Sequence, residues 1–214
     1  MPSDALILAF DTSAAHCAAA LLRGETVLAQ AEEPMAKGQG ERLLPLLEEI
    51  LRAGAAQWSD LDALGVGVGP GNFTGVRISV SAARGLALGL GVSAIGVSIF
   101  DARAEGLPRP LTVVENARRD QVYLQNFDGA ETQPHLLDCN DLPFTSANAL
   151  TGSAAQLVAD LAGAPVLSPV YPLAVAIARV AQRRFGTGQP RPAPLYLRGP
   201  DAAPPSDPPP KLLA

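Results

Sequence analysis

The feature that most constrains the fold is a glycine-rich segment between an apolar run and a helical pattern. Residues 65–78 read Gly-Val-Gly-Val-Gly-Pro-Gly-Asn-Phe-Thr-Gly-Val-Arg-Ile, and the apolar run covers residues 62–68. Helical spacing follows over residues 76–90, so the stretch predicts a buried strand, a glycine loop and a helix in that order. This succession is typical of α/β folds.

From the residues alone, the glycine loop has two interpretations. Glycine permits positive φ and close backbone approach, and free N–H groups at a helix N-terminus suit an anion. On that interpretation Gly69, Gly71, Thr74 and Gly75 are candidate phosphate-proximal residues. The alternative is a tight turn that needs glycine for packing. The loop lacks the Gly-Lys-Ser/Thr ending of a P-loop, which excludes that mechanism.

A second candidate site ends the first expected strand, where Asp11, Thr12 and Ser13 follow an apolar run. Their carboxylate and hydroxyl groups suit a nucleotide phosphate or its magnesium ion. The alternative is that Asp11 caps a turn through local hydrogen bonds. No glycine lies between Asp11 and Arg23, although a backbone that wraps around a phosphate needs one.

The first half of the chain alternates between strand and helix patterns. We expect strands and helices in the order β-β-β-α-β-α-β, at residues 5–10, 17–22, 26–31, 41–53, 62–68, 76–90 and 91–97. Gly54 is placed to end the first helix, and Pro45 is expected in its first turn or at a kink. This order suits an RNase H-like lobe.

The pattern of the second half resembles that of the first, with strand patterns at residues 111–115 and 121–127 and a helix pattern at 172–185. The expected organisation is a lobe over residues 1–100, a second RNase H-like lobe over residues 101–198 and a tail over residues 199–214. The tail is rich in proline, and a composition of this kind is expected to be disordered.

The helix pattern at residues 76–90 carries two lines of small residues. Ser81, Gly85 and Gly89 form one, and Ser79, Ala83 and Ala87 form the other. Such lines let another helix approach closely, either within the lobe or from a second subunit. We favour a subunit interface and assign to it the apolar residues of both helices, namely Leu43, Leu47, Ile50, Val76, Val80, Ala83 and Leu90.

Composition and the scarcity of reactive residues exclude several classes of function. The net charge of −5 argues against a protein that holds tRNA by itself. The two histidines, His16 and His135, are far apart and lack metal-ligand spacing, and no nucleophile elbow is present. Cys17 and Cys139 form no CxxC motif, which fits a reducing cytosol. We therefore predict no catalytic residue, no metal, no export signal and no membrane span.

Arginines give the second half some basic character, and two interpretations remain open for them. One interpretation assigns them to contacts with RNA or acidic partners, and the other places them on solvated helix faces. The residues concerned are Arg118, Arg119, Arg179, Arg183, Arg184, Arg191 and Arg198.

Several of these stretches together resemble the TsaB (YeaZ) family of bacteria. The resemblance spans nearly the whole chain and rests above all on the segment Gly69–Ile78. The other matching stretches are Ile7–Ser13, Glu41–Pro45, Ala117-Arg118 with Val122-Tyr123, and Pro194–Arg198.

The resemblance implies an actin-like (ASKHA) α/β fold of two RNase H-like lobes with mixed sheets flanked by helices. It also implies a cytoplasmic, non-catalytic scaffold that forms a homodimer when alone and binds the catalytic subunit TsaD. With TsaD and the ATPase TsaE, the family takes part in forming N6-threonylcarbamoyladenosine in the anticodon loop of tRNAs that read A-starting codons. Contact with tRNA is expected only through the complex. No tightly bound cofactor is implied, and ATP or ADP would sit at the interface of the complex.

Two positions depart from the family pattern, since Gln39 replaces a frequent histidine and Asn116 replaces the usual aspartate of the second lobe. The loss of that carboxylate weakens any nucleotide or metal role of the second lobe. The competing hypothesis is an autonomous ATP-dependent small-molecule kinase of the actin-like superfamily, with Asp11 as its magnesium ligand or base.

Overall fold

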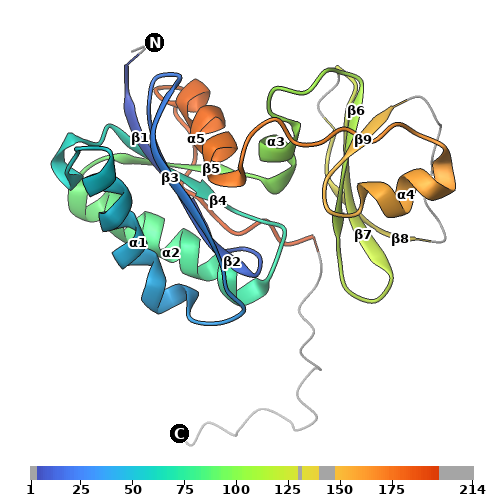
Figure 1. Cartoon of the computed structure of the whole chain (residues 1–214), viewed down its shortest axis with the longest axis horizontal. Helices are drawn as coiled ribbons and strands as arrows, with labels where there is room; N and C mark the ends of the chain where they lie inside the picture. Colours follow the sequence, from blue (N-terminus) through green and yellow to red (C-terminus); the bar gives the residue numbers. More distant parts are fainter. Residues whose placement is uncertain (1–3, 130–131, 140–147, 198–214) are drawn as a thin grey trace, which may run out of the picture.

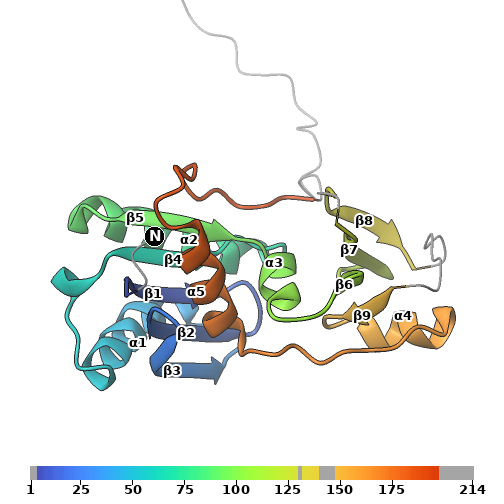
Figure 2. The ribbon, with the colours of Figure 1, turned by 90° about the horizontal axis from the view of Figure 1, so that it is seen from above.

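The protein has two lobes that lie side by side, each built on its own sheet (Figure 1, Figure 2). The computed structural model describes residues 4–129, 132–139 and 148–197. The first lobe contains a five-stranded sheet in the order β3-β2-β1-β4-β5, and the second contains a four-stranded sheet in the order β8-β7-β6-β9.

The sheet of the first lobe begins with three antiparallel strands and continues with two parallel ones. Strands β1 (Leu6–Asp11), β2 (His16–Arg23) and β3 (Thr26–Pro34) form the antiparallel part. Strand β4 (Ala63–Gly67) pairs parallel to β1, and β5 (Ser93–Val97) pairs parallel to β4. Because helices cover both faces, every residue of the central strand β1 is buried.

Alternation along β1 divides the core of this lobe between its two faces. Leu6, Leu8 and Phe10 pack toward α1 (Gln39–Ala53) and α2 (Phe73–Leu90), whereas Ile7 and Ala9 pack toward α5 (Leu173–Arg184). Figure 1 shows α1 and α2 next to each other on one face of the sheet and α5 on the other. A short 3-10 helix, Trp58–Asp60, precedes β4.

Helix α5 comes from the part of the chain assigned to the second lobe, yet it packs against the sheet of the first. Gly65 makes this close approach possible, because an added Cβ would lie 3.1 Å from the Cβ atoms of Ala9 and Ala181. Helix α3 (Ile99–Ala104) also contacts α5. A division of the chain at residue 100 therefore does not describe where α5 lies.

The second lobe repeats the strand order of the first on a smaller scale. Strands β6 (Leu111–Asn116), β7 (Gln121–Phe127) and β8 (His135–Asp138) are antiparallel neighbours, and β9 (Ala149–Thr151) pairs parallel to β6. Helix α4 (Ala155–Ala162) packs on this sheet through a core that includes Val158. The order β8-β7-β6-β9 thus corresponds to β3-β2-β1-β4.

The expected succession of the first half is confirmed, with shifts at the ends of elements. Helix α2 begins at Phe73 rather than Val76, and β3 runs on to Pro34. Pro45 lies in the interior of α1, beyond its first turn. Elements α3, α4, β8 and β9 had no clear pattern in the sequence. The predicted tail at residues 199–214 lies outside the described residues. Within the described ranges, no helix combines the length and apolar character needed to cross a bilayer.

Candidate functional site

The turn that follows β1 lies directly against the glycine loop, so the structure brings the two candidate phosphate sites together. The Asn72 N–H donates to the Ser13 carbonyl over 2.6 Å, and the Thr12 hydroxyl donates to the Gly75 carbonyl over 2.7 Å. A Cβ at Gly75 would overlap the Thr12 carbonyl oxygen, and one at Gly71 would overlap that of Ser13. These glycines therefore permit contact between two backbones.

Three N–H groups in the first turn of α2, those of Thr74, Gly75 and Val76, are already hydrogen-bonded. The Asn72 side chain accepts from the N–H groups of Thr74 and Gly75 over 3.0 and 3.1 Å. The next N–H, that of Val76, donates to the Asn72 carbonyl over 2.9 Å. Gly69, with a φ of 86°, places its carbonyl to accept from the Ile99 N–H. A phosphate at this helix end would have to displace the Asn72 cap.

Asp11 is a local anchor in this arrangement. Its Oδ1 atom accepts from the Ser13 N–H over 2.9 Å and from the Ser13 hydroxyl over 2.8 Å. The same oxygen lies 2.8 Å from His16 Nε2. Oδ2 occupies the space over Gly67, where a Cβ would overlap it. The local-cap interpretation therefore describes these contacts, and a nucleotide phosphate or magnesium ion at this turn stays a prediction.

His16 is held in the same cluster, beside two carboxylates. Burial of the ring lowers its pKa, but the hydrogen bond to Asp11 and the charges of Asp11 and Glu32 outweigh this, so the pKa of His16 is raised above 6.5. The positive charge of Arg103 opposes the increase. The imidazolium and the Asp11 carboxylate thus stabilise each other.

The apolar side chains assigned to a partner interface lie mostly inside the first lobe. Six of the seven are at most 4% exposed and belong to the core between the two helices and the sheet, namely Leu43, Leu47, Ile50, Val76, Val80 and Ala83. Leu90 is partly buried against the same core. The assignment of these side chains to the surface is therefore corrected, because the helices use their apolar faces to cover their own sheet.

The outer face of α2 carries the first of the two small-residue lines. Ser81, Gly85 and Gly89 are exposed, whereas Ser79 and Ala83 are buried. A Cβ added at Gly85 or Gly89 would meet no atom within 4 Å. Leu88, on the same helix, is 85% exposed. Nothing in the lobe itself requires these glycines, although each costs a helix about 1 kcal/mol relative to alanine.

Three of the basic residues of the second half pair with carboxylates of the chain itself. Arg183 forms a bidentate pair with Glu105, and Arg184 Nη2 donates to Asp101 over 2.9 Å. Arg179 pairs with Glu25 and lies 3.4 Å from Glu105. Sequence spacing gave no signal for these long-range pairs. Among the other arginines, Arg118, Arg119 and Arg191 are exposed, and Arg198 lies outside the described residues.

The two positions that depart from the family pattern have structural roles. Asn116 donates from its backbone to the Ser153 hydroxyl over 2.9 Å and from its side chain to the Ser153 carbonyl over 3.1 Å. Ser153 in turn donates to Glu115 over 2.6 Å. Gln39 donates to the Met35 carbonyl over 3.1 Å at the start of α1. Asn116 therefore fastens the loop before α4 to the end of β6.

An exposed aromatic cluster had no signal in the sequence. The Arg77 guanidinium lies 3.5 Å from the centre of the Phe73 ring, and its Nε donates to the Tyr196 hydroxyl over 2.8 Å. Phe73 and Tyr196 are 50% and 48% exposed. Residues far apart in the sequence thus form one surface feature at the start of α2. In the described ranges, no group of three or more His, Cys, Asp or Glu residues is arranged to hold a metal ion.

Comparison with known proteins gives a family match over most of the chain. The family model of TsaD, tRNA N6-adenosine threonylcarbamoyltransferase, matches residues 30–182. A sequence search of curated proteins finds no match.

Solved structures agree with this match. The chain is similar to YeaZ from Pseudomonas aeruginosa, with a TM-score of 0.74 and 25% identity over 90% of this chain and 100% of that one. It is also similar to an uncharacterized protein with similarity to peptidase YeaZ from the same organism, with a TM-score of 0.75 and 26% identity over 91% and 100% of the two chains.

A more distant likeness concerns the fold alone. Component A of the (R)-2-hydroxyglutaryl-CoA dehydratase of Acidaminococcus fermentans has a TM-score of 0.57 and 11% identity, over 84% of this chain and 98% of that one. The two mixed sheets with flanking helices, together with these likenesses, show an actin-like fold of the ASKHA type.

Proposed function

The chain belongs to the TsaD family of tRNA N6-adenosine threonylcarbamoyltransferases, in its TsaB (YeaZ) branch, and on this premise we propose that it is a scaffold subunit that binds and activates TsaD. The family match and the YeaZ structures support a role in the tRNA threonylcarbamoyl pathway. The proposed scaffold role rests on the geometry of the first lobe.

The observation that carries the proposal is the filled space between the β1–β2 turn and the glycine loop. Asn72 caps the helix end, and Asp11 bonds to Ser13 and His16. A phosphate-transferring site needs free donors at the place where the phosphate arrives. Here the N–H groups of Thr74 and Gly75 donate to Asn72 and the Asn72 N–H holds the β1–β2 turn, which favours a subunit without catalytic residues. Any ATP or ADP would then need donors from a second chain, at the interface of the complex.

The surface proposed for TsaD is the outer face of α1 and α2. It combines the exposed glycines Gly85 and Gly89 with the exposed side chains of Leu44 and Leu88. Small residues let a partner helix approach, and exposed leucines give it apolar surface to cover. The same face would serve the homodimer when TsaD is absent. Contact with TsaE and tRNA would follow through the assembled complex in the cytoplasm.

The test uses a substitution on this face that leaves the core untouched. Gly85→Arg introduces a long, charged side chain where no atom of the chain lies within 4 Å, so the lobe can accommodate it. We expect this variant to fold but to lose co-purification with TsaD, whereas Leu157→Glu on the exposed face of α4 keeps it. Ala83→Arg is unsuitable, because Ala83 is fully buried and its replacement would disrupt the fold.

Light scattering during size-exclusion chromatography gives the readout, with the chain alone and then mixed with TsaD from the same organism. A homodimer that converts to a heteromeric complex is the expected result. If Gly85→Arg assembles with TsaD as the unchanged chain does, this surface is the wrong one. Failure to associate under any nucleotide condition, together with ATP turnover by the isolated chain, would favour the kinase hypothesis instead.

A further inference from the structure

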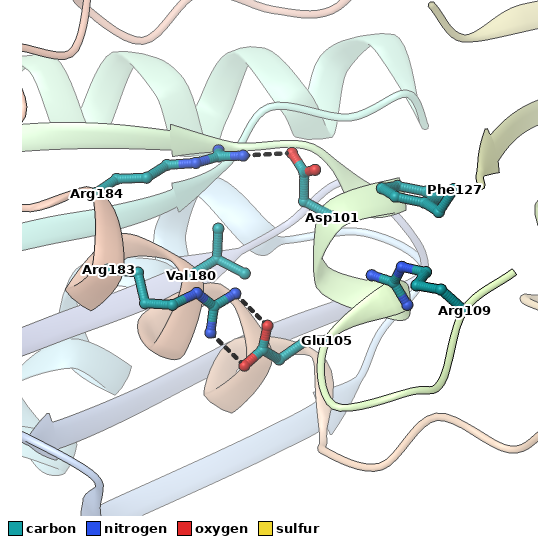
Figure 3. A pocket seen from close by; sticks show the side chains of 7 residues that line it. All are labelled: Asp101, Glu105, Arg109, Phe127, Val180, Arg183 and Arg184. Atoms are coloured by element: carbon teal, nitrogen blue, oxygen red, sulfur yellow. Dashed lines mark hydrogen bonds and ion pairs between the residues drawn. The ribbon is translucent and has the colours of Figure 1, made fainter. Parts of the chain in front are cut away.

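A cavity of about 190 Å³ lies between α3, α5 and the edge of the second lobe (Figure 3). Helices α3 and α5 contribute charged side chains, and Phe127 from β7 closes the side that faces the second lobe. Its size is below that of sites for drug-sized ligands, which begin at roughly 300 Å³. Five charged residues line it, namely Asp101, Glu105, Arg109, Arg183 and Arg184.

The charges of the cavity do not balance. Arg183 pairs with Glu105, and Arg184 pairs with Asp101, so each of these pairs is neutral. Arg109 has no carboxylate within ion-pair distance among the described residues. Figure 3 shows its guanidinium turned toward the Arg183–Glu105 pair, with no dashed line joining it to either residue. One positive charge therefore remains without a partner at the wall of the cavity.

Two backbone carbonyls and an aromatic ring hold Arg109 in place without using all of its N–H donors. Its Nη1 atom donates to the carbonyls of Ala104 and Leu107 over 3.0 and 2.8 Å. The guanidinium carbon lies 4.9 Å from the centre of the Phe127 ring, within the range of a cation–π contact. Nε and Nη2 have no acceptor in the described part of the chain, and together they form the edge with which arginine binds a carboxylate through two hydrogen bonds.

The electrostatic setting agrees with this geometry. Partial burial lowers the pKa of Arg109, and the charge of Arg183 lowers it further, while Glu105 and Asp101 raise it without restoring its usual value. Arg109 is exposed overall, and its guanidinium is desolvated only on the side that meets the cavity wall. An anion that accepts from Nε and Nη2 would compensate for the lost solvation.

We propose that this cavity binds a small carboxylate monoanion, with the Nε–Nη2 edge of Arg109 as its donor and Phe127 as the apolar wall beside it. A single negative charge neutralises the cavity, whereas a phosphate dianion would add a repulsive charge next to Asp101 and Glu105. The volume suits an anion of a few heavy atoms and excludes a nucleotide. Because Phe127 belongs to the second lobe, the bound anion would touch both lobes.

The test is a titration of the full chain, labelled with nitrogen-15, with sodium propionate at constant ionic strength. The Nε–Hε resonance of Arg109 is assigned from its loss in Arg109→Lys. We expect saturable shifts of this resonance with a dissociation constant on the order of 1 mM, as befits so small a ligand. Inorganic phosphate is expected to bind more weakly, and stronger binding of phosphate would overturn the assignment to a carboxylate monoanion.

Substitutions test whether binding needs the Nε–Nη2 edge of Arg109 or only its positive charge. Arg109→Lys keeps the charge but lacks the two-donor edge, so we expect propionate affinity to fall at least about tenfold. Phe127→Leu keeps the Nε–Nη2 edge and is expected to lose less propionate affinity than Arg109→Lys. The control is Arg52→Gln, which removes an exposed charge from the last turn of α1, on the face of the sheet opposite α5, and should bind propionate normally. Unchanged affinity in Arg109→Lys, or no saturable shift in the unchanged chain, would overturn the proposal.

Two sources of a carboxylate are distinguished by one further titration. N-acetylglycylglycine carries the carboxyl end of a peptide, and its amide carries none. Binding of both propionate and the free acid supports a site open to both sources, whereas binding of propionate alone assigns the site to a free small carboxylate. Equal binding of the peptide amide would contradict a carboxylate site. These titrations do not require TsaD, so their failure would not contradict the proposed function.

Discussion

At the scale of single residues, the cluster of Asp11, Ser13 and His16 shows how residues typical of a ligand site can serve a turn. Ser13 and His16 both lie within hydrogen-bond distance of Asp11 Oδ1. From the sequence, Asp11 fitted a magnesium ligand or a local cap equally well. The contacts in the structure fit the cap, because the turn packs against the glycine loop and Asp11 is only 1% exposed.

The raised pKa of His16 predicts a pH dependence of stability. The unfolded chain has a His16 pKa near 6.5 and the folded chain a higher one, so the folded state binds the proton more tightly. The resulting stabilisation is fully present below pH 6.5 and is lost as the pH rises through the folded pKa. We expect the free energy of unfolding, measured with urea at a series of pH values, to fall over this window.

His16→Gln is the control for this prediction, because it keeps a hydrogen-bond donor beside Asp11 but cannot take up a proton in this range. The fall in stability across the window should be smaller in this variant. Identical pH profiles of the two proteins would show that His16 does not contribute to the dependence.

At the scale of elements, helix α2 contains glycines in two different surroundings, one at its first turn and one near its last turns. Its first turn meets the β1–β2 turn, where Gly75 has no room for a Cβ against the Thr12 carbonyl. Its last turns face outward, where Gly85 and Gly89 have open space. Glycine therefore allows close backbone packing at one end of the helix and, in our proposal, the approach of a partner at the other.

This contrast gives a matched pair of substitutions on one helix. Gly75→Ala forces the Thr12 turn away and should lower the free energy of unfolding by about 1–3 kcal/mol or more. Gly89→Ala adds a methyl group to open space and should raise it by about 0.5–1 kcal/mol. Urea denaturation at low protein concentration measures both. A Gly75→Ala variant as stable as the unchanged chain would contradict the close backbone contact.

At the scale of the whole molecule, the first lobe is assembled from distant parts of the chain. Helix α5 covers the face of the five-stranded sheet that α1 and α2 leave open, and its Ile177 and Ala181 are almost fully buried. Its arginines also fasten α3, which leads to the second lobe, through Asp101 and Glu105. The two lobes are thus interleaved along the chain rather than consecutive.

A truncation tests this arrangement. A fragment of residues 1–168 ends before α5 and should lose cooperative unfolding, because one apolar face of the sheet would lie in water. A fragment of residues 1–197 retains every described element and should keep it. Urea titrations followed by amide resonances in nuclear magnetic resonance spectra report on both. Cooperative unfolding of the shorter fragment would show that the first lobe is complete without α5.

The sequence by itself determined the local order of the first half, since hydrophobic periodicity and the glycines near residues 65–78 act over a few residues. The family resemblance carried the actin-like fold. That the glycine loop packs against the turn after β1 was decided only by the tertiary structure, because this contact involves Ser13 and Thr12, about sixty residues away along the chain.

Contacts between distant segments also explain the other differences between the sequence-based predictions and the structure. Which side of α2 is buried, where α5 packs and which carboxylate each arginine meets all depend on contacts between segments far apart in the chain. Periodicity gave the apolar face of α1 and α2 but not what covers it, so Leu43 and Val80 were placed at an interface when they line the core. Only the folded molecule fixes such pairings, because burial is a property of the assembled layers.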